Sequence, residues 1–407
     1  MNLKHLAREL LAIGSILTAV NSSIAQIWVQ TGADTNYQWQ AIACSTNANK
    51  MAAVAYDDGL GDGGPIYMST NTGTSWARTG APTNFAWQSV ASSADGSKLV
   101  AVVYQDLLGN PGHIFVSTNS GRNWRVTSAP ADNWLSVASS ADGSRLVAVD
   151  SGSGDKLIYV STNSGTSWNP SGAPGNFWSS IASSVDGSKL AAVDSGFGDG
   201  FIYVSTNSGT SWGPTTAPNN PWSCIASSAD GSRLAAGNSG FGDGLIYIST
   251  NSGATWSPTT APTNQWSSIA SSAEGLRLVA ADSGYGDGLI YVSTNGGGSW
   301  ASVSPLGFWN SVATSADGSV LSAVSYPGGI YVSLLAPVLS IAQAGENAVI
   351  SWPNLSSTSG FVLQENSNLA RTNWYAVGTP PSQTNGMNQV LVPSTPTGGI
   401  FFRLKSQ

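Results

Sequence analysis

The chain has little charge, because Asp, Glu, Lys and Arg together make up only 9% of its 407 residues, against about a quarter in typical globular proteins. The charge that is present is mostly negative, with a formal net charge of −7. Nucleic acids and anionic membranes attract basic surfaces, so a sparsely charged acidic chain argues against both as partners. We therefore expect no nucleic-acid ligand.

The sequence also lacks a long apolar run. Residues 10–20 are mostly apolar, but a membrane-spanning helix takes about 20 such residues, so no membrane span is expected. This run follows the basic residues Lys4 and Arg8 and precedes small residues at 23–25. The arrangement is typical of a secretory signal peptide that is cleaved after Ala25. We assign residues 1–25 to this peptide and expect the mature protein to be secreted, outside the cell or at its surface.

Cysteine and histidine are scarce, with two residues of each. His113 has no second histidine near it, so a zinc site or a catalytic triad is not expected. Cys44 and Cys224 fall in different sequence repeats, and we expect two small thiols rather than a disulfide. No cofactor is expected, with calcium as the one alternative left open.

Tryptophan is abundant, with 16 residues, and it marks an internal repeat. One unit, residues 266–300, reads WSSIASSAEGLRLVAADSGYGDGLIYVSTNGGGSW. Each unit holds four short alternating segments separated by Gly, Asn, Asp and Ser, which is the pattern of a four-stranded propeller blade. The opening tryptophan recurs at spacings of 48, 47, 44, 44, 44 and 43 residues, at Trp39, Trp87, Trp134, Trp178, Trp222, Trp266 and Trp309.

The last unit ends at Leu335 without a fourth segment. The N-terminal segment supplies one, because residues 28–33 (WVQTGA) match residues 76–81 (WARTGA). An N-terminal strand in the last blade would close the ring and remove exposed sheet edges. The sequence thus predicts an all-β fold, with a seven-bladed β-propeller over residues 26–335.

Residues 336–407 lose the repeat. Four apolar segments, at 349–352, 361–364, 373–377 and 401–404, predict the strands of a small β-sandwich-like domain. This segment resembles the fibronectin-like modules that end many secreted bacterial proteins. The chain is therefore divided into a signal peptide (1–25), a propeller (26–335) and a small C-terminal all-β module (336–407).

A second resemblance concerns the propeller. Residues 69–76 (STNTGTSW) resemble the Asp box, Ser-x-Asp-x-Gly-x-x-Trp, of BNR-type propellers, and the motif recurs from Ser117, Ser161, Ser205, Ser249 and Ser293. Asn replaces the central Asp in all six copies, and its side-chain oxygen keeps the acceptor that the turn needs. Asp boxes occur in sialidases, xyloglucan-cleaving glycosidases, sorting receptors and a photosystem assembly factor, so the fold does not decide the function.

An enzyme is the first functional hypothesis. The resemblance to sialidases implies three arginines for the substrate carboxylate and a Tyr–Glu pair, and glycosidases in general need two facing carboxylates. The propeller has one glutamate, Glu274, and Arg145, Arg233 and Arg277 share a repeat position that other blades fill with lysine. We therefore assign no catalytic residue, and keep a sialidase-like or xyloglucanase-like glycoside hydrolase as the alternative.

The favoured hypothesis is a non-enzymatic binding module. The loops between second and third strands are rich in Gly and Asp, and they share one face with the opening tryptophans. Carboxylates, Gly-rich backbone and aromatic rings on one face are suited to the recognition of a glycan or a protein surface. The predicted ligand-binding residues are the seven opening tryptophans and three loop aromatics, Phe197, Phe241 and Tyr285. Two alternatives stay open. In one, Gly and Asp simply form the turns while the tryptophans pack between blades. In the other, the protein is purely structural or adhesive.

The same loops are candidates for calcium. Paired carboxylates five positions apart around two glycines could share a hard cation with backbone carbonyls. The candidate ligands are Asp57, Asp62, Asp150, Asp155, Asp194, Asp199, Asp243, Asp282 and Asp287. In blade 5, Asn238 stands where the first Asp of the pair is expected.

Overall fold

The computed structural model describes residues 26–407 except 59–60, 62, 151–155, 197–198, 241–242, 285, 336–338, 345–346, 354–360, 368–372, 385–386, 394–399 and 407. The proposed signal peptide, residues 1–25, lies outside the described residues. The described part forms 35 strands and no α-helix. None of its elements is therefore a helix that could cross a bilayer.

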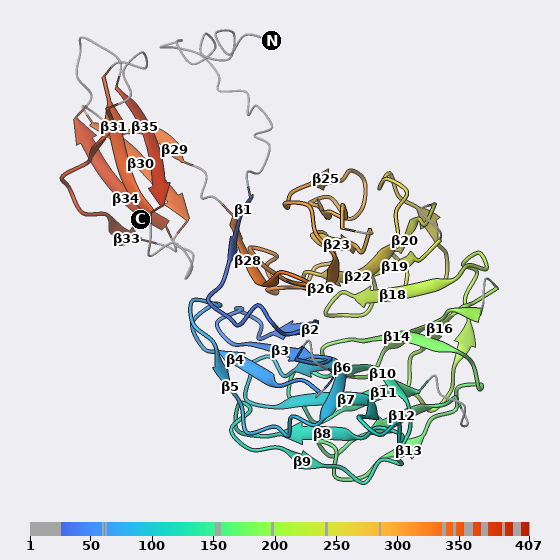
Figure 1. Ribbon diagram of the computed structural model, residues 1–407. Coiled ribbons are helices and arrows are strands. Elements are labelled where there is room, and N and C mark those ends of the chain that lie inside the picture. The colour runs from blue at the N-terminus through green and yellow to red at the C-terminus, as the bar shows by residue number, and fades with distance from the viewer. Residues whose placement is uncertain are drawn as a thin grey trace.

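Seven four-stranded antiparallel sheets follow one another round a ring in chain order, from blue to orange in Figure 1. Blades 1 to 3 are β2(Trp39–Cys44), β3(Met51–Ala55), β4(Ile66–Ser69), β5(Ala77–Arg78); β6(Phe85–Ser92), β7(Leu99–Asp106), β8(Ile114–Ser117), β9(Arg125–Val126); and β10(Trp134–Ser139), β11(Leu146–Asp150), β12(Ile158–Ser161), β13(Asn169–Pro170). Blades 4 to 6 are β14(Trp178–Ser183), β15(Leu190–Asp194), β16(Ile202–Ser205), β17(Gly213–Pro214); β18(Trp222–Ser227), β19(Leu234–Asn238), β20(Ile246–Ser249), β21(Ser257–Pro258); and β22(Trp266–Ser271), β23(Leu278–Asp282), β24(Ile290–Ser293), β25(Ala301–Ser302). Blade 7 joins β26(Trp309–Thr314), β27(Val320–Ser325) and β28(Gly329–Leu335) to β1(Gln26–Gln30).

Burial explains the composition of each strand. The second strands are rich in Ala, Val and Leu and, except for the last three residues of β7, buried at every position, as in β15, because neighbouring blades cover both of their faces. The fourth strands are two residues long in blades 1 to 6 and mostly exposed. Three of them end in proline, which an outer edge tolerates because its N–H side needs no partner.

The predicted closure of the ring by the N-terminus is confirmed. β1 pairs antiparallel with β28 over five residues, from Gln26 opposite Leu335 to Gln30 opposite Tyr331. The ring of Trp28 lies 6.0 Å from that of Trp309, between centroids. The last blade is thus built from both ends of the propeller sequence.

A closed circle of backbone hydrogen bonds links all seven blades. The amide after each first strand donates to the matching carbonyl of the next blade at 2.7–2.8 Å. The circle runs through Thr46, Ala94, Ala141, Val185, Ala229, Ala273 and Ala316, and returns to Thr46. Because each bond needs the next blade at the same height, the circle sets the blades at equivalent positions around the axis.

The turns between third and fourth strands share one hydrogen-bond pattern. In blade 1 the hydroxyl of Ser69 accepts from the amide of Gly73, and the side-chain oxygen of Asn71 accepts from the amide of Ser75, both at 2.9 Å. The same Asn bond recurs in the other five copies. Asn therefore serves this turn as an acceptor in place of Asp.

The C-terminal residues form two sheets of a sandwich, drawn in red and orange apart from the ring in Figure 1. One sheet has the order β29(Ser340–Ala344), β30(Asn347–Pro353), β34(Met387–Pro393), β33(Ser382–Thr384); the other has the order β32(Tyr375–Ala376), β31(Phe361–Asn366), β35(Phe401–Ser406). Its core contains Ile350, Trp352, Leu363, Val390 and Val392.

Candidate functional site

The blades present two different faces. The turn face carries the turns that join first to second strands. The loop face carries the loops that join second to third strands and the connections between blades. On the loop face these two kinds of segment bond to each other, as when the amide of Asn220 donates to the carbonyl of Gly200 at 3.1 Å and that of Asn264 to Gly244 at 3.0 Å. In blades 1 to 6 the loop is thereby anchored to the next blade.

The opening tryptophans lie inside the protein, so the prediction that they contact a ligand is wrong. Their exposed fraction is 0% to 1%, at Trp39, Trp87, Trp134, Trp178, Trp222, Trp266 and Trp309. Each ring packs edge-on against an aromatic ring of the third strand, as Trp222 does against Tyr247 with centroids 5.4 Å apart. A large apolar ring is what fills the wedge between two blades, so packing decides its place.

These tryptophans nevertheless shape the loop face. The indole nitrogen of Trp266 donates to the carbonyl of Gly244 in the loop of the preceding blade at 3.1 Å, and Trp87 bonds Gly64 in the same way at 3.0 Å. Trp87 and Trp266 thus hold the loop of the preceding blade in place without reaching the surface.

The acidic loops divide their carboxylates between the interior and solvent. Asp194 and Asp282 are buried and accept hydrogen bonds from the amides of Gly196 at 2.9 Å and Gly284 at 3.0 Å. Asp150 is buried at the equivalent position. The second carboxylates are exposed, at Asp199, Asp243 and Asp287. The first carboxylate therefore closes the start of its loop, and only the second faces solvent.

Five predicted residues, Asp62, Asp155, Phe197, Phe241 and Tyr285, lie outside the described residues. Within the described part of the chain, no three His, Cys, Asp or Glu side chains are grouped so that they could hold a metal ion. The calcium hypothesis stays a prediction.

The structure corrects the alignment of Asp57. Strand pairing sets Ala55 opposite Trp39, just as it sets Asp194 opposite Trp178 and Asp282 opposite Trp266. Asp57 therefore lies two residues further into its loop than the buried carboxylates. The sequence pattern suggested that Asp57 is equivalent to Asp194, because Asp57 begins an Asp-rich segment that resembles the other loops. The position of a residue in its loop is decided instead by how the second strand pairs with the first.

Asp194 gives a testable pH dependence. Burial raises the pKa of its carboxyl group above the usual value, although hydrogen bonds from backbone amides partly offset this. A raised folded-state pKa contributes stability that is complete below the unfolded pKa, near 4, and is lost as the pH rises through the folded pKa. At pH 7 the buried charge is therefore a cost to stability.

We expect Asp194→Asn to raise the melting temperature by about 1–3 °C at pH 7, a size common for single stabilising substitutions. Asn238 shows that the amide fits, because its oxygen accepts from Gly240 and Leu245 in blade 5. The gain should vanish near pH 4, and Asn238→Asp should give the opposite shift, both measured by thermal melts. A lower melting temperature for Asp194→Asn at pH 7 would contradict this reading.

The turn face is occupied by structural contacts. The hydroxyl of Ser140, with the amide and hydroxyl of Ser144, donates to the carboxylate of Asp142 and holds its pKa at about 2. Lys98 crosses to the next blade, where its ammonium group donates to the Ser164 hydroxyl at 3.4 Å and its stem covers Gly143.

Blades 1 and 3 to 6 repeat this contact with lysine or arginine, whereas blade 7 has Val320 at the same position. Arg145, Arg233 and Arg277 cover the turn glycines of blades 4, 6 and 7, at three separate seams between blades. Glu274 is exposed on one of these turns. Each of these arginines is thus placed to hold two blades together.

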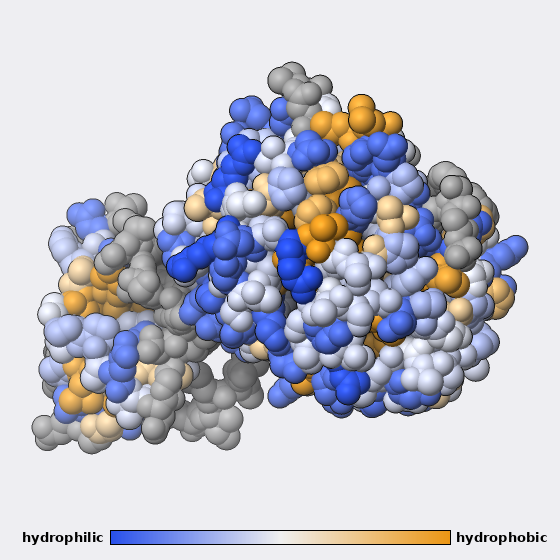
Figure 2. All heavy atoms as spheres, turned by 90° about the horizontal axis from the view of Figure 1, so that it is seen from below, coloured by the Kyte–Doolittle hydropathy of each residue, from blue (hydrophilic) through white to orange (hydrophobic). Residues whose placement is uncertain are grey.

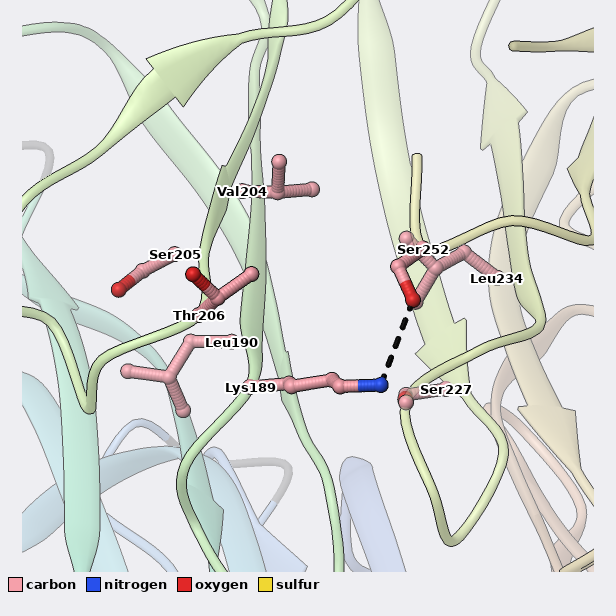
Figure 3. A pocket seen from close by; sticks show the side chains of 9 residues that line it. Lys189, Leu190, Val204, Ser205, Thr206, Ser227, Leu234 and Ser252 are labelled. Atoms are coloured by element: carbon pink, nitrogen blue, oxygen red, sulfur yellow. Dashed lines mark hydrogen bonds between the residues drawn. The ribbon is translucent and has the colours of Figure 1, made fainter. Parts of the chain in front are cut away.

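Four hollows at the seams between described residues are very small. Figure 3 shows one, where Lys189 of blade 4 reaches Ser252 of blade 5 beside Leu190, Val204 and Leu234. Its volume of about 10 Å³ is at the lower limit for a single water molecule. Such hollows are too small for a sugar or a peptide side chain.

A larger cavity, of about 270 Å³, lies where the first strands of six blades end around the axis. Its lining includes small apolar residues, the thiol of Cys44 and the hydroxyls of Ser139 and Thr314, and contains no charged residue. These hydroxyls donate to backbone carbonyls of their own blades. Burial raises the pKa of the Cys44 thiol to about 12, although part of the residue reaches the cavity. Cys44 and Cys224 are both free.

Blades 7, 1 and 2 depart from the repeat on the loop face. The loop between second and third strands differs in length. It runs from Asp194 to Ile202 in blade 4 and is three residues longer in blade 1, where it runs from Ala55 to Ile66. In blade 7 it is shorter and runs from Ser325 to Ile330. In these three blades, the residue directly after the strand partner of the opening tryptophan is a tyrosine. These residues are Tyr56, Tyr104 and Tyr326. Sequence reasoning missed these tyrosines, although the spacings of 48 and 47 residues marked blades 1 and 2 as different.

The fold and its two faces define the chain as a seven-bladed β-propeller with a small C-terminal sandwich. No protein-family model and no curated protein matches the sequence. Among solved structures, the chain is similar to one titled "YCF48 bound to D1 peptide", with a TM-score of 0.55 and 13% identity. The match covers 78% of this chain and 98% of that one. At this identity the likeness shows the fold, which the β-propeller of that protein shares.

Proposed function

We propose that this chain is an exported, non-enzymatic binding protein that recognises a glycan or another cell-surface component through its loop face. The proposal covers the finer assignments as well: Asp-box-type turns, a fibronectin-like C-terminal module and a cleaved signal peptide. The hydrogen-bond pattern at Ser69, Asn71 and Gly73 supports the first of these. Lys4, Arg8 and the apolar run after them support the last.

One observation carries the proposal: the blades differ from one another on the loop face and repeat on the turn face. The residue before the opening tryptophan changes in almost every blade, as Gln38, Ala86, Asn133, Phe177, Pro221, Gln265 and Phe308. On the turn face the same Ser, Gly and Lys/Arg contacts recur and connect one blade to the next. Recognition of an asymmetric ligand needs singular side chains, and these gather on the loop face.

The surface is otherwise suited to an exposed soluble location. Figure 2 shows one side of the molecule, where hydrophilic and neutral residues predominate and hydrophobic residues gather only in small patches. The protein titled "YCF48 bound to D1 peptide" shows that a propeller of this fold can bind a peptide. A peptide is therefore the competitor that any test with glycans must include.

The test is a screen of residues 26–407 against a glycan array and a peptide array, followed by hydrogen-exchange mass spectrometry with the best ligand. We expect a saturable glycan interaction that protects amides of the second-to-third-strand loops and leaves those of the turn face unchanged. The same samples should release no reducing sugar above a blank without protein. Protection confined to the turn face, or steady glycan hydrolysis, would contradict the proposal.

A further inference from the structure

Three tyrosines occupy one structural position in three blades. In each blade the position directly follows the strand partner of the opening tryptophan, which is Ala55, Val103 or Ser325. Blades 1, 2 and 7 place tyrosine there, at Tyr56, Tyr104 and Tyr326. Blades 4, 5 and 6 place serine there, at Ser195, Ser239 and Ser283. The exchange of serine for tyrosine is therefore confined to one sector of the ring.

The three tyrosine-bearing blades are neighbours. The circle of backbone bonds joins Ala316 of blade 7 to Thr46 of blade 1, and Thr46 to Ala94 of blade 2. The backbone at each tyrosine is held to a neighbouring connection: the amide of Tyr56 donates to the carbonyl of Gln38 at 2.7 Å, and that of Tyr326 to Phe308 at 3.2 Å. In blade 2 the carbonyl of Tyr104 accepts from the side chain of Asn133 at 3.1 Å. The tyrosines thus form an arc on a rigid base.

Folding does not account for these rings. The tyrosines of the third strands, such as Tyr203 and Tyr247, pack against the opening tryptophans. Among the described residues, Tyr56, Tyr104 and Tyr326 have neither an aromatic neighbour nor a hydrogen bond from the hydroxyl. The serine hydroxyls at the same position in blades 4 to 6 each bond a carbonyl of the neighbouring connection. Serine therefore meets the structural need, and tyrosine adds an aromatic surface.

The arc is accessible and lies beside other apolar side chains. Tyr326 is 39% exposed, and Tyr56 and Tyr104 are half-buried, so all three residues reach solvent. Phe308 at 38% and Leu306 at 65% extend the surface in the connection before blade 7. Aromatic rings fixed on a scaffold offer large contact area at little cost in conformational entropy.

The charge around the arc restricts the ligand. Four carboxylates lie in the loops and connections of this sector, at Asp34, Asp57, Asp58 and Asp106. The described residues of these segments contain no lysine or arginine. The basic residues of blades 1 and 2 lie elsewhere, as Lys50 does at the turn face and Arg78 in the outer strand β5. These negative charges would repel an anionic ligand, whereas a neutral sugar meets no such repulsion.

We propose that the arc of Tyr56, Tyr104 and Tyr326 binds a neutral glycan chain, whose sugar rings stack their apolar C–H faces on successive tyrosines across blades 7, 1 and 2. This inference rests on the proposed function and gives its loop face a specific sector and ligand class. The shape agrees with the chemistry, since three equivalent positions on consecutive blades present a row of rings to an extended chain.

The test replaces each tyrosine with the serine that blades 4 to 6 carry, so that the fold is preserved. Tyr56→Ser, Tyr104→Ser, Tyr326→Ser and the triple variant are compared with the parent by affinity electrophoresis in gels containing xyloglucan, mixed-linkage glucan, galactomannan or polygalacturonate. Each single change should weaken binding to the best neutral polysaccharide by about tenfold and the triple change by about 100-fold or more. Melting temperatures should stay close to that of the parent.

Phe201→Ser is the matched control, because Phe201 is a loop-face aromatic of blade 4 with 38% exposure, close to the 39% of Tyr326. It should keep binding within about twofold, which is within ordinary variation for a residue outside the site. If the parent binds a neutral glycan but the triple variant binds equally well, the arc is wrong while the proposed function stands. If the parent binds only polygalacturonate or only peptides, the assignment of a neutral glycan as the ligand is wrong. If the parent binds none of the glycans and no cell-surface component, both this inference and the proposed function are wrong.

Discussion

Deleting residues 26–33 should lower the melting temperature of the propeller by at least about 10 °C or cause it to aggregate. These residues contain β1, whose five register pairs cover the edge of β28, and Thr31, whose amide donates to the carbonyl of Ile330 at 2.9 Å. They also carry Trp28, which packs in one cluster with Trp309, Val312 and Tyr331. The deletion therefore exposes an unpaired strand edge and part of the core of blade 7 at once.

Two neighbouring substitutions separate these effects. Trp28→Ala removes the ring from the cluster and should cost about 2–4 kcal/mol of unfolding free energy, somewhat less than for a fully buried tryptophan. Val29 lies on the same strand with 56% of its surface exposed, so Val29→Ala should change stability by no more than about 0.5 kcal/mol. Chemical denaturation of all three proteins gives the comparison. A deletion variant that melts like the parent would show that the ring does not need β1.

The second large effect is expected at the opening tryptophans. Trp266→Ala should destabilise the propeller by about 3–5 kcal/mol, because the ring is fully buried between blades and its removal leaves a cavity. The indole nitrogen also donates to Gly244, so the substitution additionally removes one of the two hydrogen bonds that this carbonyl accepts.

Two phenylalanine substitutions separate the contribution of packing to the free energy of unfolding from that of the indole hydrogen bond. Trp222 is as fully buried as Trp266, but its indole nitrogen has no hydrogen-bond partner among the described residues. Trp266→Phe should therefore cost about 1 kcal/mol more than Trp222→Phe in denaturant titrations, which is the usual net value of one buried hydrogen bond. Equal costs would mean that the bond to the loop adds nothing to stability.

Much of the fold could be predicted from the residues because every blade of a propeller carries the same sequence pattern. Trp, Leu and Gly recur at blade spacing, and the same local turn chemistry applies each time, as the Ser69–Asn71 turn illustrates. The match of Trp28 to Trp76 predicted which strand closes the ring, because strand identity depends on local pattern and the pairing of β1 with β28 follows from it.

The candidate site was harder to predict, because its residues are defined by relations between strands. Asp57 looked equivalent to Asp194 until strand pairing placed Ala55 opposite Trp39. The tyrosine arc also depends on strand pairing, since Tyr56 and Tyr326 are 270 positions apart in the numbering and share a position only through the register of their blades.

The sequence by itself determined the number of blades, their strand content and the closing strand, since these follow from periodicity, turn residues and one unpaired segment. Only the tertiary structure decided which aromatic residues are available to a ligand. The opening tryptophans are buried because a neighbouring blade lies on each side, whereas Tyr326, in the loop between β27 and β28, is 39% exposed. Burial depends on what packs against a residue, and in a ring that neighbour belongs to another repeat.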